Sequence, residues 1–337
     1  MASKSAHADL TAGAAGVRSD RLEPGRGRLA ERPAELPPAG WRDILLRVWE
    51  KLGEDHTSLV AAGIALNTLL AVFPALAVAV LIYGLFSSPA GVAGDVKPFI
   101  EILPADAAKL LQDQLQSLVR PTHVKLGIGA VVSALLAFWS ARQGIVALMT
   151  ATNIAYYERE RRGFVWQIAI SLAFTLAAVV AFLVMLVLGI AVPLVLKLLP
   201  LGPVAATAIL VFRWVLLWLF AVGALAVVYR YAPDRHNAKW SWVTWGSVVA
   251  ATLWLSASVL FELYVKNFSS YGVTYGALGG VIALIMWFYL GGFAVVLGAE
   301  INAEMEHQTA VDTTEGPPKP MGERGAYVAD TLGRKPE

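Results

Sequence analysis

Residues 164–196 read FVWQIAISLAFTLAAVVAFLVMLVLGIAVPLVL and contain no charged side chain. A helix of about 20 apolar residues crosses the roughly 30 Å hydrocarbon core of a bilayer, so this stretch is long enough to span a membrane. Five further apolar blocks of more than about 20 residues occur in the chain. The six blocks are Thr57–Phe86, Val124–Thr152, Phe164–Leu196, Pro203–Val228, Trp242–Tyr264 and Gly276–Ala299. The sequence therefore predicts an all-α, polytopic membrane protein with a six-helix transmembrane bundle.

The composition supports a membrane protein and excludes several kinds of site. Hydrophobic residues make up 57% of the 337 positions and charged residues only 15%, whereas soluble domains have about 25% charged residues. The absence of cysteine excludes disulfides, iron–sulfur clusters and thiolate zinc sites. The five histidines are scattered and lack metal-ligand spacing, and no phosphate-binding loop or nucleophile elbow occurs. We therefore expect no metal, no other cofactor and no enzymatic activity.

The basic residues predict the orientation of the chain. Of the 27 lysines and arginines, 19 fall in the two tails and in the loops after the second and fourth blocks, and six fall in the alternate loops. Loops with an excess of basic residues stay on the cytoplasmic side, so both termini are expected there. The remaining two, Arg142 and Arg213, lie inside apolar blocks.

The segments outside the spans differ in character. Residues 1–40 lack the apolar region of a signal peptide and are expected to form a disordered cytoplasmic tail, as are residues 309–337. Between them, residues 41–308 form the predicted membrane domain. Trp41–Leu52 is amphipathic, with its apolar residues on one helical face and the charged residues, Asp43 and Arg47 among them, on the other. This pattern predicts a helix in the membrane interface, in contact with lipids. Asp95–Val119 is also amphipathic and is expected to form an external helical segment.

Polar residues inside or near the spans are the candidate functional groups, because a charge within the bilayer is costly and normally faces the bundle interior. They are Asn67, Arg142, Arg213, Glu262, Glu300 and Glu304. Asn67 and Arg142 lie at similar depths, about 15 Å and 16 Å from the cytoplasmic ends of their spans, and could meet. Arg142 could instead pair with Glu300, and Arg213 with Glu262. Such pairs either fix helix register or line a substrate path, and the sequence leaves both readings open.

Two short patterns carry further hypotheses. Gly272, Gly276 and Gly280 recur at four-residue intervals, which favours close helix packing, with a flexible segment lining a pathway as the alternative. The cytoplasmic turn after the fourth span contains Asp234 and Arg235. Its basic residues suit lipid phosphates, but a topology signal explains them equally well.

Several of these motifs together resemble the YihY/BrkB family. They are SLVAAGIALNTLLAVFPAL at 58–76, FWSARQGIVALMTATNIAY at 138–156, YRYAPDRHNAKW at 229–240, and YGVTYGALGG with GAEIN between 271 and 302. The resemblance covers residues 40–308 and implies a six-span protein of the bacterial inner membrane. The family was formerly labelled ribonuclease BN. This chain argues against that label, because it lacks a soluble domain, metal ligands and a nucleic-acid-binding face.

Two functional hypotheses follow. The first is a transporter, or a translocator of a lipid or solute, with an unidentified substrate. The second is a membrane-organising or partner-binding protein that does not transport, with a homo-oligomer formed through the glycine-lined helix. Neither hypothesis includes a nucleic-acid partner.

Overall fold

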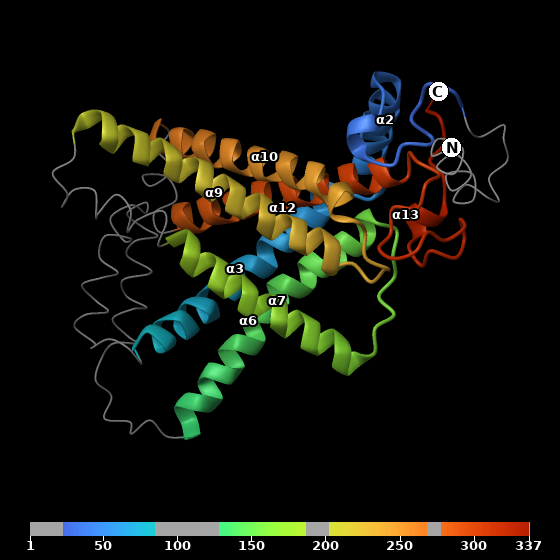
Figure 1. Ribbon diagram of the computed structural model, residues 1–337. Helices are drawn as coiled ribbons and strands as arrows, with labels where there is room; N and C mark the ends of the chain where they lie inside the picture. The colour runs from blue at the N-terminus through green and yellow to red at the C-terminus, as the bar shows by residue number, and fades with distance from the viewer. Residues whose placement is uncertain (1–22, 85–127, 187–201, 268–277, 337) are drawn as a thin grey trace.

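The computed structural model describes residues 23–84, 128–186, 202–267 and 278–336. Regular structure in these ranges is helical, apart from an isolated β-bridge between Ala238 and Thr314, which confirms the all-α prediction. The helices are η2 (Pro33–Glu35), α2 (Pro38–Glu54), α3 (Thr57–Gly84), α6 (Ile128–Ala155), α7 (Phe164–Leu186), α9 (Pro203–Tyr231), α10 (Trp240–Asn267), α12 (Leu278–Glu306) and α13 (Tyr327–Asp330) (Figure 1).

Four helices of the described chain are long and apolar enough to cross a membrane. Their spans are Phe164–Met185, Thr207–Tyr231, Trp240–Phe261 and Gly279–Glu306. Helices α3 and α6 coincide with the first two predicted blocks, but the apolar stretch identified in α3, Thr57–Ala71, is shorter. The membrane class is thus established with four clear spans, and the count of six stays a prediction. The predicted external segment, 95–119, lies outside the described residues.

Proline and left-handed backbone positions set several helix boundaries. Pro38 and Pro203 each occupy the first turn of a helix, where a missing N–H costs nothing. His56 and Tyr157 adopt positive φ values of 48° and 57°. Such a conformation cannot continue a helix, so His56 separates α2 from α3 and Tyr157 follows the end of α6.

Helix α12 lies at the centre of the fold and packs against α10, α3, α2 and α6 (Figure 1). The crossing with α10 is very close: a Cβ on Gly246 would lie 2.0 Å from the carbonyl oxygen of Gly298. Asn302 fixes the same crossing, because it accepts from the Gly246 amide at 2.8 Å and donates to the Val243 carbonyl at 3.1 Å. Only glycine, which has no side chain, allows the two backbones to approach this closely.

Helix α12 also sets the position of α3. Gly292 faces Ala61 and Ile64, with an added Cβ 3.2 Å from the Ala61 carbonyl oxygen. The polar residues 300–306 of α12 follow two to four turns later, beside α2 and the turn that joins α2 to α3. This register places α12 carboxylates next to the beginning of α3.

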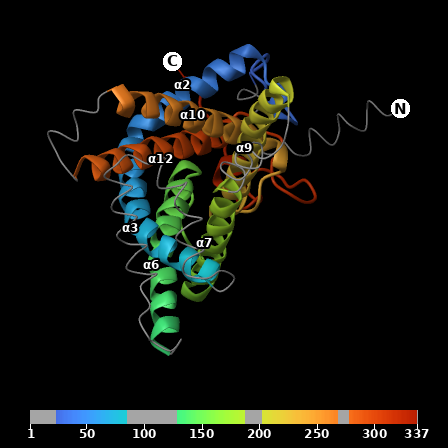
Figure 2. The same ribbon diagram turned by 90° about the vertical axis from the view of Figure 1, so that its left-hand side faces the viewer.

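Helices α7 and α9 form an outer layer, with α7 against α6 and α9 against α10 (Figure 2). Their apolar side chains point outward: Phe164, Val165 and Val204 are 75%, 79% and 83% exposed. An apolar surface of this extent is expected on a helix that faces lipid rather than water.

The N- and C-terminal parts of the described chain meet at one end of the helices. We call this region the polar end, and it consists of residues 23–56, the loop 156–163, the turn 232–239 and the segment 307–336. The Ala310 amide donates to the Arg28 carbonyl at 2.8 Å, and the Tyr327 amide donates to Glu158 at 2.7 Å. Figure 1 shows α2 and α13 at this same end.

The predicted disordered tails are wrong where the structure describes them. Thr309, Asp312 and Val328 are buried in the C-terminal segment, and Leu36 is buried in the N-terminal one. The polar composition suggested disorder, but these side chains and their backbone find hydrogen-bond partners across the polar end. Residues 1–22 lie outside the described chain.

Helix α2 differs from its predicted pattern. Asp43 and Arg47, expected on the polar outer face, are buried, whereas Leu45 and Trp49 are exposed. The charged residues face inward because each forms an ion pair there. Asp43 pairs with Arg26, and Arg47 pairs with Glu304 of α12. The exposed Leu45 and Trp49 suit contact with a membrane surface, and the interfacial location of α2 stays a prediction.

Candidate functional site

Glu304 of α12 is the hub of a buried polar network. Its Oε2 accepts from Arg47 Nε at 2.5 Å, and the exposed fractions of the two side chains are 1% and 4%. Arg47 also donates to Gln308 Oε1 at 2.7 Å and to the Glu304 carbonyl at 3.1 Å. The Tyr157 hydroxyl donates to Glu304 Oε1 at 3.2 Å. This network connects α2, the end of α6 and α12.

Glu306 forms a second buried pair on the same helix. Arg235 Nη2 donates to Glu306 Oε1 at 2.7 Å, and neither side chain is exposed. Thr313 donates to the other oxygen at 2.8 Å, and the Arg235 guanidinium lies 4.3 Å from the ring centre of Tyr156. Burial raises the pKa of the Tyr156 hydroxyl far above its ordinary value, so Tyr156 stays neutral. The turn 232–239 is thereby fixed to α12.

Glu300 differs from both of these carboxylates. It is fully buried, and neither of its oxygens has a hydrogen-bond partner among the described residues. The charged groups that act on it are Asp55 and Glu304, which repel its negative charge, and Lys51, which attracts it. A buried carboxylate without a partner is far more stable with a proton than without one.

Asp55 shares this unusual environment. It lies in the turn between α2 and α3, and its Oδ2 is buried without a hydrogen-bond partner in the described chain. Burial raises the pKa of the Asp55 carboxyl above its ordinary value, with Lys51 opposing the rise. The neighbouring His56 is exposed. Acidic groups therefore lead from the exposed turn toward the interior at Glu300.

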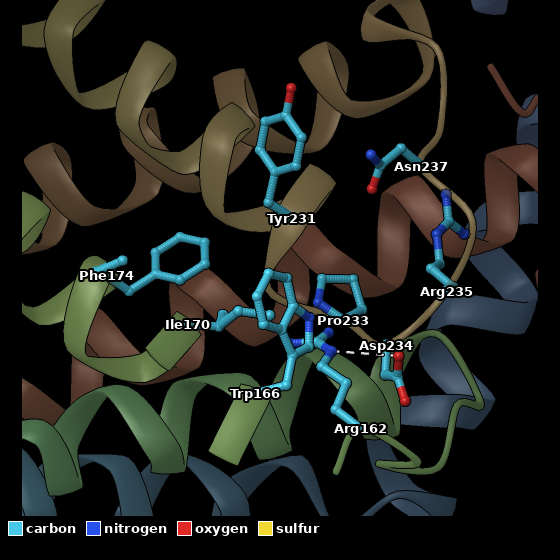
Figure 3. Close-up of a pocket in the computed structure, with 10 residues that line it drawn as sticks. Arg162, Trp166, Ile170, Phe174, Tyr231, Pro233, Asp234, Arg235 and Asn237 are labelled. Atoms are coloured by element: carbon cyan, nitrogen blue, oxygen red, sulfur yellow. Dashed lines mark hydrogen bonds and ion pairs between the residues drawn. The ribbon is translucent and has the colours of Figure 1, made fainter. Parts of the chain in front are cut away.

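A pocket of about 410 Å³, which we call the lateral pocket, opens at the polar end between α7 and the turn that follows α9. Its lining residues are Arg162, Trp166, Ile170, Ala173, Phe174, Tyr231, Pro233, Asp234, Arg235 and Asn237. Figure 3 shows the α7 side chains on one side and the turn residues on the other, with Arg162 joined to Asp234 by an ion pair. The pocket thus has an apolar wall and a polar wall.

Comparisons with known proteins fit this architecture. The family model described as Virulence factor BrkB matches residues 48–322. The chain belongs to the BrkB family. The matched range runs beyond α12 into the C-terminal segment, so about half of the polar end lies within the family region. No solved structure matches the chain.

Relatives of this BrkB-family chain carry general names. It is 32% identical to the putative ribonuclease-like protein YfkH of Bacillus subtilis, over 59% of this chain and 73% of the relative. It is 27% identical to a UPF0761 membrane protein of Psychromonas ingrahamii, over 78% and 87% of the two chains. A UPF0761 membrane protein of Rhodospirillum centenum is 26% identical over 90% and 65%. These names establish a membrane-protein family and no substrate.

The structure changes the predicted partners of Arg142. Arg142 is buried, but its Nε donates to Ser171 Oγ of α7 at 2.5 Å, and its guanidinium lies 4.7 Å from the Trp139 ring centre. Asn67 donates to the Gly63 carbonyl of its own helix at 2.8 Å. Arg142 therefore joins α6 to α7, and the predicted pairs with Asn67 and Glu300 are wrong.

The remaining candidates are only partly described. Arg213 is half-buried on α9, with its guanidinium 5.2 Å from the Trp214 ring centre. The Glu262 side chain, Gly272 and Gly276 lie outside the described parts, so the Arg213–Glu262 pair and the full glycine face stay predictions. Gly280 is buried in the first turn of α12.

Both turn residues hold structural contacts. Asp234 accepts from the Arg161 amide at 2.6 Å and from Arg162 Nε at 3.2 Å. Arg235 forms the Glu306 pair described above.

Three residues of the site are missing from the sequence prediction. The sequence pattern places Arg47 on the polar face of its helix, Glu306 lies beyond the last predicted span, and Arg162 contributes only to the charge count of its loop. A signal for Glu306 is present, because the polar run AEINAEME at 299–306 extends to it beyond the last apolar block. No signal in a single sequence identifies the partners of Arg47 or Arg162.

Proposed function

We propose that this BrkB-family protein is a transporter that translocates a lipid or another amphipathic substrate and binds a proton at Glu300 during its cycle. The observation that carries the proposal is the fully buried Glu300, whose two oxygens have no hydrogen-bond partner among the described residues. Buried ionisable groups in membrane helices mark ion and proton pathways more often than they contribute stability.

A structural role does not account for Glu300. Glu304 and Glu306 on the same helix each have an arginine partner, as a carboxylate that holds helices together requires. Glu300 has none, so it adds a desolvation cost without an ion pair in return. Asp55, in the turn between α2 and α3, supplies a second acidic group that interacts with Glu300. A proton relay uses such a sequence of groups.

The lateral pocket supports an amphipathic substrate. It opens between α7 and the turn after α9, next to the apolar outer surface of α7. A substrate that lies in the bilayer reaches this pocket sideways, without first entering water. The proposal includes six spans in the bacterial inner membrane, with the polar end and both termini on the cytoplasmic side, where the excess of basic residues belongs. It includes no enzymatic step.

The test uses purified protein in vesicles of phosphatidylethanolamine and phosphatidylglycerol that carry a fluorescent phosphatidylglycerol. Dithionite destroys the dye in the outer leaflet, so the signal reports translocation from the inner leaflet. We expect translocation at least about tenfold faster than in protein-free vesicles, with a rate that changes when a pH difference is imposed. Glu300→Gln should remove the pH response, whereas the exposed carboxylate variant Glu323→Gln should retain it.

Wild-type vesicles that behave like protein-free vesicles under pH differences of both directions would contradict the proposal. That result would favour the alternative of a membrane-organising protein. A translocation rate that responds to pH equally in Glu300→Gln would leave transport intact but remove Glu300 from it.

A further inference from the structure

Two arginines that line the lateral pocket, Arg162 and Arg235, have buried guanidinium nitrogens without a hydrogen-bond partner among the described residues. Arg235 is held in its ion pair with Glu306, whereas Arg162 pairs with Asp234 of the turn. The Arg162 side chain is only 8% exposed. Nε pairs with Asp234 Oδ1 at 3.2 Å, and Nη2 donates to the Ala232 carbonyl at 2.8 Å. Nη1 is buried and has no hydrogen-bond partner among the described residues. Two of the three guanidinium nitrogens therefore position the group, and a ligand that reaches Nη1 would supply the partner that it lacks.

A buried N–H without an acceptor costs as much free energy as a lost hydrogen bond, so this donor favours an acceptor from a ligand. The guanidinium is planar and presents its N–H groups in a fixed fork that matches phosphate oxygens. Asn237 adds an amide to the same polar wall. Figure 3 shows both residues at the pocket, Asn237 from the turn and Arg162 from the loop before α7.

The opposite wall is a single apolar stripe of α7. Trp166, Ile170, Ala173 and Phe174 line the pocket at spacings of four, seven and eight residues from the tryptophan, which places them on one helix face. Trp166 is itself 63% exposed and lies in the first turn of a membrane-spanning helix. Tryptophan at this position is typical of the headgroup level of a bilayer.

The exposed charged residues of the loop beside the pocket are basic. Arg159 and Arg161 are exposed on the same loop as Arg162. The carboxylates nearby are Glu158, Asp234 and Glu160, the last of them 3.5 Å from Arg162 Nε. Three arginines thus face three partly buried carboxylates, and exposed basic residues beside a membrane attract anionic headgroups.

We propose that this pocket binds an anionic phospholipid, with Arg162 Nη1 donating to a phosphate oxygen and an acyl chain lying along the Trp166–Phe174 stripe. A volume of about 410 Å³ accommodates a headgroup and the beginning of a chain. A soluble phosphate would use the arginine but leave the apolar wall in contact with water. A phospholipid would contact both walls, with its phosphate at the polar wall and its acyl chain along the apolar wall.

The test is native mass spectrometry of the full chain in detergent, titrated with dioleoyl-phosphatidylglycerol. Parallel titrations use dioleoylglycerol, which has the same chains without phosphate, and inorganic phosphate as a competitor. We expect phosphatidylglycerol to bind at least about tenfold more tightly than dioleoylglycerol, with little displacement by inorganic phosphate. Arg162→Lys, which retains the charge but loses the fork, should weaken this preference about tenfold. Arg159→Ala removes an exposed arginine of the same loop and should have a smaller effect.

Trp166→Ala provides a second variant that leaves the Arg162 contacts in place. It should weaken phosphatidylglycerol binding and leave the response to inorganic phosphate unchanged. Unfolding temperatures measured on the same samples separate lost binding from lost folding. Equal binding of both lipids, full displacement by inorganic phosphate, or wild-type affinity in folded Arg162→Lys would each overturn the proposal.

The binding site does not depend on transport. A chain that binds phosphatidylglycerol at Arg162 but does not translocate it would overturn the proposed function and leave this site intact. If the protein translocates phosphatidylglycerol but Arg162→Lys binds it as tightly as the wild type, the proposed function stands and this site is overturned.

Discussion

Arg47 and Glu304 form a buried ion pair between residues 257 positions apart in the chain, with Nε and Oε2 separated by 2.5 Å. The pair joins the first described long helix, α2, to the end of the central helix, α12. It therefore holds together two parts of the chain, α2 and the end of α12, that no local sequence pattern connects.

Removing one member of this pair should destabilise the protein strongly. Arg47→Ala leaves the Glu304 carboxylate buried without its ion-pair partner, although it keeps the Tyr157 hydroxyl, His307 and the more distant charge of Lys51. The expected loss is about 3–5 kcal/mol in the free energy of unfolding, measured by denaturant titration in detergent. Arg334 is the matched control, because its ion pair with Glu50 is exposed on both sides. Arg334→Ala should change stability by less than about 0.5 kcal/mol, and an equal loss in the two variants would contradict the buried hub.

Glu300 and Glu304 of α12 should lose very different amounts of stability on the same neutral substitution. Glu304→Gln removes the charge that Arg47 needs and should cost about 3 kcal/mol or more. Glu300→Gln preserves shape at a position without an ion pair and should cost less than about 1 kcal/mol. Thermal unfolding of both purified variants checks this difference. A larger loss for Glu300→Gln would show that Glu300 holds a structural partner.

The α10–α12 crossing should not tolerate a methyl group. In Gly246→Ala the added Cβ would lie 2.0 Å from the Gly298 carbonyl oxygen, so the helices must separate. We expect a loss of at least about 1–3 kcal/mol, as for other overpacked interiors. Gly223→Ala on α9 has open space around its Cβ and should be neutral, or stabilising by up to about 1 kcal/mol. Similar unfolding midpoints for the two variants would argue against the close approach.

The sequence predicts the helices well because each depends on local information. Apolar blocks long enough to cross a bilayer identify the membrane helices, and α7 and α10 begin within two residues of the predicted starts of their blocks. Helix α12 is the exception, since it continues to Glu306 through a polar run beyond the predicted apolar block, which ends at Ala299. Its polar residues stay helical because α2 and the C-terminal segment cover them.

The partners of the charged residues could not be predicted from depth alone. Arg142 and Asn67 lie at matching depths, yet Asn67 bonds to its own helix and Arg142 turns to Ser171. Depth constrains one coordinate, whereas rotation about the helix axis decides which neighbour a side chain meets. The C-terminal segment illustrates the same limit. Its polar composition is typical of disorder, but the segment is ordered by hydrogen bonds to distant residues such as Arg28 and Lys239, which its own sequence does not reveal.

Acid should release this C-terminal segment. Burial raises the pKa of Asp312, but hydrogen bonds from the Lys319 and Thr314 amides and the charge of Arg324 outweigh burial, so its pKa lies below the ordinary value. A depressed pKa means that the ionised form stabilises the fold. This stabilisation is complete above the ordinary aspartate pKa of about 3.9 and is lost as the pH falls below it, through the lower pKa of the folded state. Limited proteolysis of residues 309–336 against pH should therefore show a protected segment at neutral pH that becomes cleavable under strong acid. Asp312→Asn should make the segment cleavable at neutral pH and flatten this acid step, while the exposed variant Glu323→Gln should keep the wild-type profile. An unchanged acid step in Asp312→Asn would show that another group controls the docking of the segment.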